Sequence, residues 1–316
     1  MFAIGQENPL WCAILLLAGG ALALALGALR CHRAGVPPRG IALATALLAL
    51  LTPFGSHLLY CLVDLEYTLY SYSVGYLFAF WQRGGMLYGG MAGAALALCL
   101  AGGCRSGQLF EQYAPSAAWM VAVFRVCEGL MGQGYGEYAM EETALCRFPF
   151  MMYDAYYEAW AWALFVAEAL IALLLFVALL KRRPAFAGDG ALWFAGLYAS
   201  AQIVLESLRR DEFLRWGFVR VEEVASAVVI LLVLVCYALR SRGRRRRAKA
   251  LCFALFACLV TLVVLLEFAT EGRVPFLLFL DVGGCYGAMA CACALLGGCV
   301  LWMRRLGLDA KGEISR

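Results

Sequence analysis

The sequence predicts an all-α, polytopic membrane protein with about nine transmembrane helices. Of its 316 residues, 64% are hydrophobic and 15% are charged, whereas about a quarter of the residues in soluble domains are charged. The hydrophobic residues form continuous blocks of roughly 18 residues or more, which is the length of a membrane-spanning helix. The roughly ten-residue alternation of a transmembrane β-barrel is absent from the sequence. Since backbone groups in lipid must pair within their own segment, helices are the architecture that fits.

Short polar connections separate the blocks and alternate in charge along the chain. The blocks are residues 10–29, 41–63, 86–103, 113–131, 155–180, 190–208, 218–239, 250–269 and 275–303. The basic connections are 30–39, 105, 181–183, 240–249 and the tail from 304. The positive-inside rule places them in the cytoplasm, which predicts an outer amino terminus and a cytoplasmic carboxyl terminus. The outer loop 209–220 departs from the rule, because it holds four arginines.

The remaining composition argues against several functions. The net charge of +4 does not indicate nucleic-acid binding, because the basic residues sit in short loops where membrane topology explains them. Most of the 14 cysteines lie in apolar blocks, and no Cys-x-x-Cys or Cys/His spacing indicates a metal site. We therefore expect no metal and no cofactor. The aromatic stretch 64–81 is too polar to span a membrane and is predicted to be an anchor at the outer interface.

Ionisable side chains inside spans are costly and indicate either function or helix pairing. Arg125 is predicted near the outer leaflet, and Glu128 shares its helical face. The glycine-rich residues 129–136 that follow predict irregular backbone, which is tolerated at membrane depth only when it is buried in protein or lines a cavity. Glu168 lies deeper, and we expect a buried, hydrogen-bonded or neutral group with no functional role assigned.

Three further segments bring polar groups to the same predicted outer depth. In the sixth block, Tyr198, Gln202 and Glu206 are spaced by four residues and therefore share one helical face. A simple clasp would pair Arg125 with Glu128 or Glu206. The whole constellation favours a functional site, because a clasp needs one ion pair and not a cavity with two glycine-rich walls. The further groups are Tyr198, Gln202, Glu206, Arg209 and Arg210, then Tyr153 and Asp154, and then Tyr88 between glycine pairs.

Four segments in this order resemble motifs of the prolipoprotein diacylglyceryl transferase family. Residues 84–90 are similar to its double-glycine segment around a histidine, and residues 114–136 to its signature of an arginine and a glycine-rich turn. Residues 148–154 resemble its His-Pro-Ser-Gln-Leu-Tyr-Glu box, and residues 198–211 its sixth-helix motif with the following arginine loop. The resemblance covers residues 84–239, with the first two spans matching only in topology. It implies a seven-helix transferase-like core followed by two extra carboxyl-terminal transmembrane helices.

Members of that family move a diacylglyceryl group from phosphatidylglycerol to the lipobox cysteine of prolipoproteins. The resemblance implies an enzyme of lipoprotein biosynthesis in the bacterial plasma membrane, whose partners are phosphatidylglycerol, the prolipoprotein signal peptide and membrane lipids. Arginine suits such a donor, because guanidinium groups bind phosphate through paired hydrogen bonds. The implied catalytic residues are Arg125, Glu206, Tyr88 and Glu128. The implied substrate-binding residues are Arg209, Tyr153, Tyr198, Gln202, Gln133, Gly89 and Gly90.

Two departures from the family pattern leave alternatives open. Tyr88 stands at the family's histidine position and Gln202 at a family arginine position. We therefore expect either a weak or altered transferase, or a non-catalytic relative that binds lipid or lipoprotein precursors. A small transporter is a third hypothesis, and the lack of an internal repeat counts against it. We divide the chain into a transferase-like core (1–240), an additional helix pair (250–303) and a cytoplasmic tail (304–316).

Overall fold

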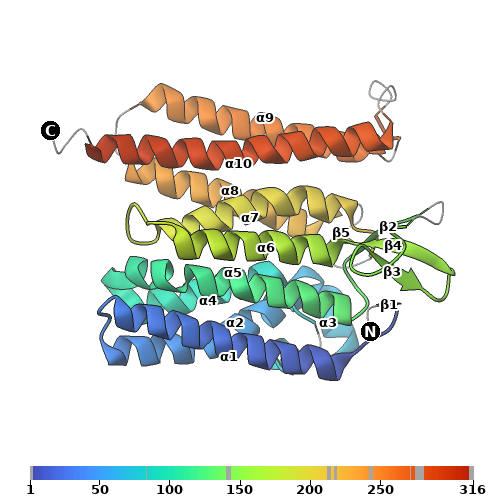
Figure 1. Ribbon diagram of the computed structural model, residues 1–316, viewed down its shortest axis with the longest axis horizontal. Helices are drawn as coiled ribbons and strands as arrows, with labels where there is room; N and C mark the ends of the chain where they lie inside the picture. Colours follow the sequence, from blue (N-terminus) through green and yellow to red (C-terminus); the bar gives the residue numbers. More distant parts are fainter. Residues whose placement is uncertain are drawn as a thin grey trace. The chain divides into compact units, whose positions relative to one another are not determined.

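Long apolar helices dominate the computed structural model of the chain (Figure 1). It describes residues 3–82, 84–139, 144–211, 215–216, 219–241, 245–270, 272–274 and 281–312. The chain divides into two compact units, and each is described by itself below. The first unit holds Met1–Ala191 with Arg209–Glu222, and the second holds Leu192–Leu208 with Glu223–Arg316.

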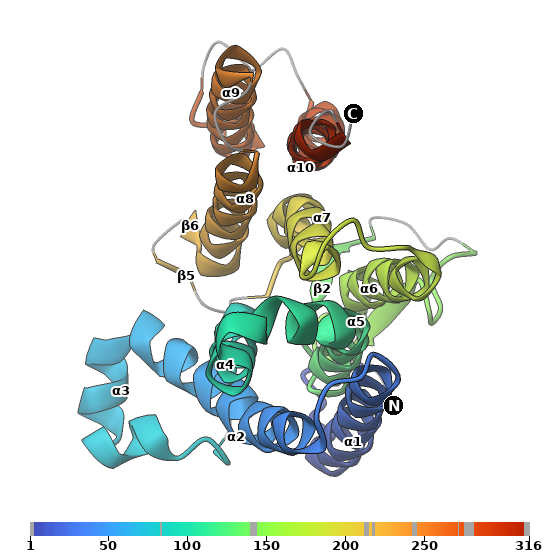
Figure 2. The same cartoon turned by 90° about the vertical axis from the view of Figure 1, so that its left-hand side faces the viewer.

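The helices of the first unit follow the predicted apolar blocks. They are α1 (Pro9–Arg33), α2 (Pro38–Val63), α3 (Leu65–Ser71), α4 (Leu87–Gly102), α5 (Ser106–Leu130) and α6 (Leu164–Lys181), with the short 3₁₀ helices η1 (Val74–Phe78) and η2 (Gly103–Arg105). Figure 2 shows the segment that contains α3 projecting sideways from α2 before the chain returns to α4. This projecting segment lies within residues 64–81, whose role as an interfacial anchor stays a prediction. Its exposed aromatic residues include Tyr67, Tyr70, Tyr72, Phe78 and Trp81.

Eight stretches in the described part of the chain are long and apolar enough to cross a membrane. Nine apolar blocks were predicted. The two counts differ because one of the eight stretches, Leu87–Leu130, contains two of the predicted blocks. Gly103 has a φ of 48°, a left-handed conformation that ends α4 and leads through η2 into α5. The polytopic, all-α fold class is thus confirmed. The side of the membrane on which each terminus lies stays a prediction.

Glycines bring α2 and α4 into contact at the level of their backbones. A Cβ atom on Gly89 would lie 2.4 Å from the carbonyl oxygen of Gly55, and one on Gly93 would lie 2.0 Å from that of Leu51. Small residues allow such close approach of membrane helices, where van der Waals packing drives association. Gly89 therefore has a packing role. Gly90 differs, because its Cβ would meet only ordinary contacts at 3.6 Å or more.

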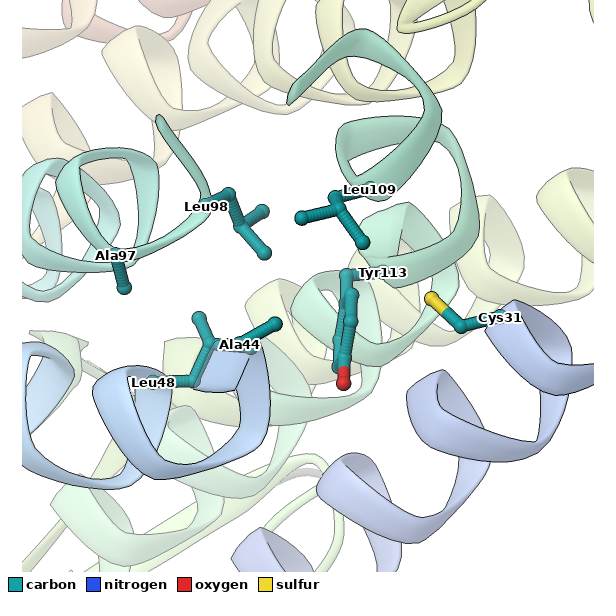
Figure 3. Close-up of a cluster of buried hydrophobic side chains, with 7 residues drawn as sticks. All are labelled: Cys31, Ala44, Leu48, Ala97, Leu98, Leu109 and Tyr113. Atoms are coloured by element: carbon teal, nitrogen blue, oxygen red, sulfur yellow. The ribbon is translucent and has the colours of Figure 1, made fainter. Parts of the chain in front are cut away.

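A second contact of four helices surrounds Tyr113 (Figure 3). The side chains of Leu98 and Leu109 point toward the Tyr113 ring, which also fills the space above Gly27. The Tyr113 hydroxyl lies 3.0 Å from the Thr45 hydroxyl, so its polar end is satisfied inside the apolar cluster. This cluster joins α1, α2, α4 and α5, and its buried members are Cys31, Ala44, Leu48, Ala97, Leu98, Leu109 and Tyr113.

A small sheet at one end of the first unit was not predicted. Its strands are β1 (Ala3–Ile4), β2 (Tyr135–Tyr138), β3 (Met151–Asp154) and β4 (Ala159–Ala163), in the order β1-β3-β4-β2. The predicted span 155–180 therefore began too early, because β4 occupies its start and α6 begins only at Leu164. Strands β5 (Arg215–Trp216) and β6 (Val219–Arg220) form a separate hairpin before α8.

The second unit is built from α7 (Asp189–Leu208), α8 (Val221–Arg240), α9 (Arg246–Thr270) and α10 (Val282–Gly312), apart from the first residues of α7 and α8. Gly196 of α7 allows close packing, because its Cβ would lie 2.8 Å from Val300 of α10 and 3.2 Å from Val233 of α8. Helix α10 continues well beyond the predicted end of the last span at residue 303. Residues 275–280, which the prediction placed in that span, lie outside the described residues.

Candidate functional site

A cluster of buried arginines and carboxylates lies in the first unit. All of its side chains are less than a tenth exposed, and Arg125, Arg209 and Glu168 are fully buried. The side chains come from α5, α6, the segment after α7 and the start of α8. Charged groups at such depth must be paired, because an isolated buried charge is very costly. The members, referred to below as the arginine cluster, are Arg125, Arg209, Arg220, Glu128, Glu168, Asp211 and Glu222.

Arg125 joins three helices through its guanidinium group. Its Nη1 atom donates to both carboxylate oxygens of Glu128, at 2.8 and 2.7 Å. Its Nη2 atom donates to Glu222 at 2.9 Å, and its Nε atom lies 3.4 Å from a carboxylate oxygen of Glu168. Each of the three guanidinium nitrogens therefore faces a carboxylate from a different helix: α5, α8 or α6. The planar fork of arginine suits such divergent contacts better than the point charge of lysine.

Arg209 and Arg220 converge on Asp211. The Arg209 Nη2 atom donates to Asp211 at 2.6 Å, and Arg220 donates to the backbone oxygen of Arg209 at 2.5 Å. Arg209 also faces Glu128 at 3.5 Å, which connects this group to Arg125. Burial by itself would raise the pKa of Asp211, but Arg209, the Gly134 amide and Arg220 together hold it below its ordinary value. Asp211 is therefore a stable anion at neutral pH.

The glycine-rich turn after α5 fastens these elements together. Gly132 and Gly134 have φ values of +70° and +73°, a conformation that side chains other than glycine rarely adopt. The Gly134 amide donates to Asp211 at 2.8 Å, and the Gly134 carbonyl accepts from Phe165 at 2.9 Å. The Gln133 amide donates to the backbone oxygen of Glu128 at 2.9 Å. The predicted irregular backbone is confirmed, and it holds the arginine cluster in place.

A more exposed set of groups lies on the sheet that continues from this turn. Arg210, which is 39% exposed, forms an ion pair with Glu137 of strand β2. The Tyr138 hydroxyl donates to Asp154 at 2.6 Å. Burial, and then this bond to Asp154, raise the pKa of Tyr138. The phenol therefore stays neutral and acts as a hydrogen-bond donor.

Comparison with known proteins identifies the family. Residues 1–239 match the family described as prolipoprotein diacylglyceryl transferase. The chain belongs to this family. The match is wider than the resemblance in residues 84–239 and includes α1 and α2, whereas α9 and α10 lie beyond it. It confirms the predicted enzyme class, a transferase, and identifies a multi-pass bacterial membrane protein.

Two relatives illustrate how far this member has diverged from the named transferases. A phosphatidylglycerol–prolipoprotein diacylglyceryl transferase of Streptococcus equi subsp. zooepidemicus (strain MGCS10565) is 25% identical over 252 residues, which make up 77% of this chain and 95% of the relative. The protein of that name from Streptococcus pyogenes serotype M5 (strain Manfredo) is 26% identical over 243 residues, or 74% of this chain and 92% of the relative. Both therefore align over nearly their whole length.

The structure of this family member brings three of the predicted site residues together. Arg125, Glu128 and Arg209 all belong to the arginine cluster. Tyr88 is buried in the first turn of α4. Tyr153 is partly exposed on β3, where its ring lies 5.3 Å from that of Trp160. The catalytic and binding roles of these residues stay predictions.

Three further predicted site residues, Tyr198, Gln202 and Glu206, lie on one buried face of α7 in the second unit. The Gln202 side chain donates to Glu206 at 3.2 Å, and the Tyr198 ring packs 5.8 Å from that of Phe194. Beside them, the Ser207 hydroxyl donates to Glu223 at 3.0 Å. The predicted proximity of Glu206 to Arg125 concerns two different units and stays a prediction.

Sequence reasoning missed four members of the arginine cluster: Glu168, Asp211, Arg220 and Glu222. Glu168 gave a signal, because it is the sole ionisable residue in the apolar stretch 159–180. It was predicted to be buried and hydrogen-bonded or neutral, and it lies against Arg125. Asp211 stands in a short polar connection, where charged residues are ordinary. Glu222 stands near the polar start of the predicted block 218–239, and nothing in the sequence links it to Arg125. Among the described residues, no group of three or more His, Cys, Asp or Glu side chains is arranged to hold a metal ion.

Proposed function

We propose that this protein transfers the diacylglyceryl group of phosphatidylglycerol to the lipobox cysteine of prolipoproteins in the bacterial plasma membrane. The observation that carries the proposal is the family match across residues 1–239. Outside α5 and α6, the members of the arginine cluster lie in or next to the loop 209–220, which is predicted at the outer face. Both substrates would reach the enzyme at that face.

The reaction requires one bond to form and one to break. The cysteine sulfur attacks the glyceryl carbon that carries the phosphate ester, a carbon–sulfur bond forms, and the carbon–oxygen bond breaks. Glycerol phosphate leaves with the bonding electrons, and the thiol proton passes to a base. The leaving phosphate gains negative charge, which a fixed guanidinium group in a dry site stabilises. In our proposal Arg125 and Arg209 supply this charge.

The proposed site lacks a good proton acceptor at position 88. Tyrosine at position 88 has an ordinary pKa of about 10 and rarely accepts a proton at neutral pH. Glu128 or Glu206 would then act as the base in its place. A positioned base is worth about 10²–10⁴ in rate, so we expect slow transfer, or transfer with altered substrate preference. Tyr153, Tyr198, Gln202, Gln133 and the Gly89–Gly90 pair complete the proposed substrate site.

The second candidate function is binding without catalysis, and one observation favours it. The donors of Arg125 all face carboxylates of the protein, and the arginine cluster holds one more carboxylate than guanidinium groups among the described residues. A phosphate would have to displace a carboxylate, or a carboxyl group would have to take up a proton first. In this case the arginine cluster serves the fold, and the protein retains lipid or precursor without transferring a group.

Two assays separate the candidates. The gene is expressed in a bacterial strain depleted of its own transferase, and the purified protein is tested in vesicles with phosphatidylglycerol and a lipobox peptide. Vesicles of phosphatidylcholine control for the donor. We expect slow growth rescue and slow thioether formation that requires phosphatidylglycerol.

Arg125→Ala should abolish both activities. Arg182→Ala is the matched control, because Arg182 also pairs with a buried carboxylate, Asp189, at 2.5 Å, but outside the arginine cluster. Arg182→Ala should retain transfer in protein that remains folded. No growth and no transfer by folded wild-type protein would exclude the transferase, and retained lipid binding would then support the second candidate.

A further inference from the structure

Three large apolar side chains are exposed beside the start of α6. Trp162 of β4 stands two residues before Leu164, the first residue of α6. The Ala163 amide donates to the Phe150 carbonyl at 2.8 Å, so the backbone of Phe150 lies at the same helix end. Exposed apolar groups that gather in one place mark interaction sites or membrane contact. The members, referred to below as the α6 aromatic group, are Phe148 (50% exposed), Phe150 (47%) and Trp162 (41%).

The pairing of β3 with β4 continues this group along one face of the sheet. Tyr153 pairs with Trp160, and Trp162 lies two residues further along β4, so all three point to one face. The rings of Tyr153 and Trp160 lie 5.3 Å apart, and Tyr153 is itself exposed. The opposite face is packed, because Met152 and Ala163 belong to a buried core cluster. The sheet therefore has one packed face and one exposed aromatic face.

The length of α6 places the start of this face at a membrane surface. The 18 residues of α6 extend over about 27 Å, slightly less than the hydrocarbon core of about 30 Å. The helix presents an apolar face to lipid, because Leu170, Leu174 and Val177 are exposed at helical spacing. A span that is slightly short draws its flanking residues to the hydrocarbon boundary. Trp162 therefore lies where the headgroups begin, the depth at which tryptophan and tyrosine concentrate.

An exposed cation accompanies the α6 aromatic group. Arg147 directly precedes Phe148 and is exposed. Its carbonyl accepts from the amides of Phe150 and Met151, both at 3.0 Å, which fixes the backbone of residue 147 beside the start of β3. Guanidinium groups bind phosphate well, and basic residues next to a span are attracted to anionic headgroups. The combination of aromatic rings and a cation fits a layer of phospholipid headgroups better than an apolar protein surface.

The far end of the hairpin lies further from α6. Figure 1 shows β3 and β4 extending beyond the end of that helix. Ala159, at the other end of β4, is three residues from Trp162, or about 10 Å along the strand. The headgroup layer of one leaflet is only about 5–8 Å thick. Tyr157, which precedes this end of β4 and is 66% exposed, should therefore lie in water.

We propose that the α6 aromatic group and the aromatic face of β3 and β4 form a membrane-contact surface. Its partner is the headgroup layer of the leaflet on the side of the sheet. Trp162 lies deepest, at the hydrocarbon boundary, and Trp160 and Tyr153 follow among the headgroups. The surface holds the sheet against the membrane and requires only the fold and lipid, so it goes beyond the proposed transfer activity.

Photocross-linking tests the surface in the full-length protein. A photoreactive benzoylphenylalanine replaces Trp162 in one variant and Tyr157 in the matched control. Each protein is placed in nanodiscs of phosphatidylglycerol and phosphatidylcholine with a lipobox peptide present, and mass spectrometry identifies the adducts after irradiation. We expect several-fold more lipid adduct at position 162 than at position 157. Peptide adducts in place of lipid at position 162, equal lipid labelling at both positions, or no adduct in folded protein would each overturn the proposal.

Fluorescence quenching provides a second measurement that keeps an aromatic ring at each position. Lipids brominated just below the headgroup quench tryptophans at that depth. The chain has eight tryptophans, so each contribution is the difference between the wild type and a single variant. We expect Trp162→Phe to lose more of the quenching than Trp160→Phe. Identical quenching in wild-type and Trp162→Phe protein would contradict the placement of Trp162.

An effect of this surface on transfer rests on the proposed function. The Phe165 amide donates to the Gly134 carbonyl at 2.9 Å, so lipid at Trp162 would lie close to the turn that fastens the arginine cluster. We expect Trp162→Ser to raise KM for phosphatidylglycerol several-fold with little change in kcat, and Tyr157→Ser to change neither. Inactive wild-type protein that still forms lipid adducts at position 162 would contradict only the proposed function and would support the membrane-contact surface.

Discussion

Replacing Arg125 by methionine should be among the most damaging single changes in the arginine cluster. Methionine retains much of the side-chain length but removes the cation that Glu128, Glu222 and Glu168 face at 2.7, 2.9 and 3.4 Å. Breaking a buried ion pair by removing one partner typically costs about 3–5 kcal/mol, because the remaining charge stays buried. Arg209 relieves part of this loss, since it lies 3.5 Å from Glu128. We therefore expect a loss of about 3–5 kcal/mol rather than a multiple of that value.

Arg125→Lys should fall between the wild type and Arg125→Met. A lysine ammonium is a single point charge and cannot face three helices at once. We expect it to retain a bond to one carboxylate and to lose about 1.5–3 kcal/mol, the value of a hydrogen bond to a charged group. An arginine-to-methionine substitution at an exposed ion pair provides the control for Arg125→Met. Arg210→Met removes the partner of Glu137 where both are more than a third exposed, so it should cost only about 0–1 kcal/mol.

The measurement is reversible unfolding of purified protein in mixed micelles with increasing dodecyl sulfate, followed by circular dichroism and tryptophan fluorescence. The order of the free energies of unfolding is the result that matters. If Arg125→Met and Arg210→Met lowered stability by the same amount, within about 0.5 kcal/mol, the arginine cluster would not be the clasp that we describe. A stabilised Arg125→Met protein would contradict the reasoning outright.

Further predictions concern topology, packing and pH. In a background without reactive cysteines, a cysteine at Glu141 should react with an impermeant reagent from outside, and one at Arg245 should not; the reverse pattern would invert the topology. Gly89→Ala should destabilise by about 1–3 kcal/mol, because its Cβ would meet a backbone oxygen at 2.4 Å; Gly90→Ala should be nearly neutral, and equal effects on stability would contradict the packing role. The pKa of Asp211 in the folded protein is lower than its usual value of 3.8. The ionised Asp211 carboxylate therefore stabilises the folded state above pH 3.8, and this stabilisation is lost as the pH falls toward the pKa of the folded state. Asp211→Asn should therefore lower stability at pH 7 more than at pH 3, as measured by thermal unfolding.

The transmembrane helices could be predicted because lipid leaves few solutions. A block such as 164–181 contains one ionisable residue before its final lysine, and a helix is the structure that pairs its backbone within the segment. Strand β4 could not be found in this way. Its sequence, Ala159–Ala163, alternates small and large side chains over five residues, but it leads directly into α6 and reads as part of one apolar block. Pairing with β3 and β2 decides its structure, and pairing partners are not visible in a single segment.

The candidate site was predictable only where a charge stood in an apolar context. Arg125 and Glu128 are three residues apart on one helix, and their contact follows from helical geometry alone. Glu222 lies 97 residues from Arg125 in the sequence, so only tertiary structure brings the two together. Of the pair Arg209 and Asp211, only the arginine could be recognised from the sequence. The arginine loop drew attention as an exception to the positive-inside rule, but the acid that holds it looked like ordinary loop composition.

The contacts of the arginine cluster explain how an arginine loop could fold on the predicted outer side of the membrane, where basic residues are unusual. Arg209 and Arg220 do not remain at the surface as isolated cations. Both bind Asp211, and Arg220 also binds the backbone of Arg209. Their charge is thus neutralised within the protein, whereas Arg210 lies partly exposed and pairs with Glu137. Because the carboxylates of the arginine cluster outnumber its guanidinium groups among the described residues, an anionic headgroup could enter only if it displaced a carboxylate or a carboxyl group first took up a proton. The same contacts that stabilise the fold would then set the affinity for the lipid.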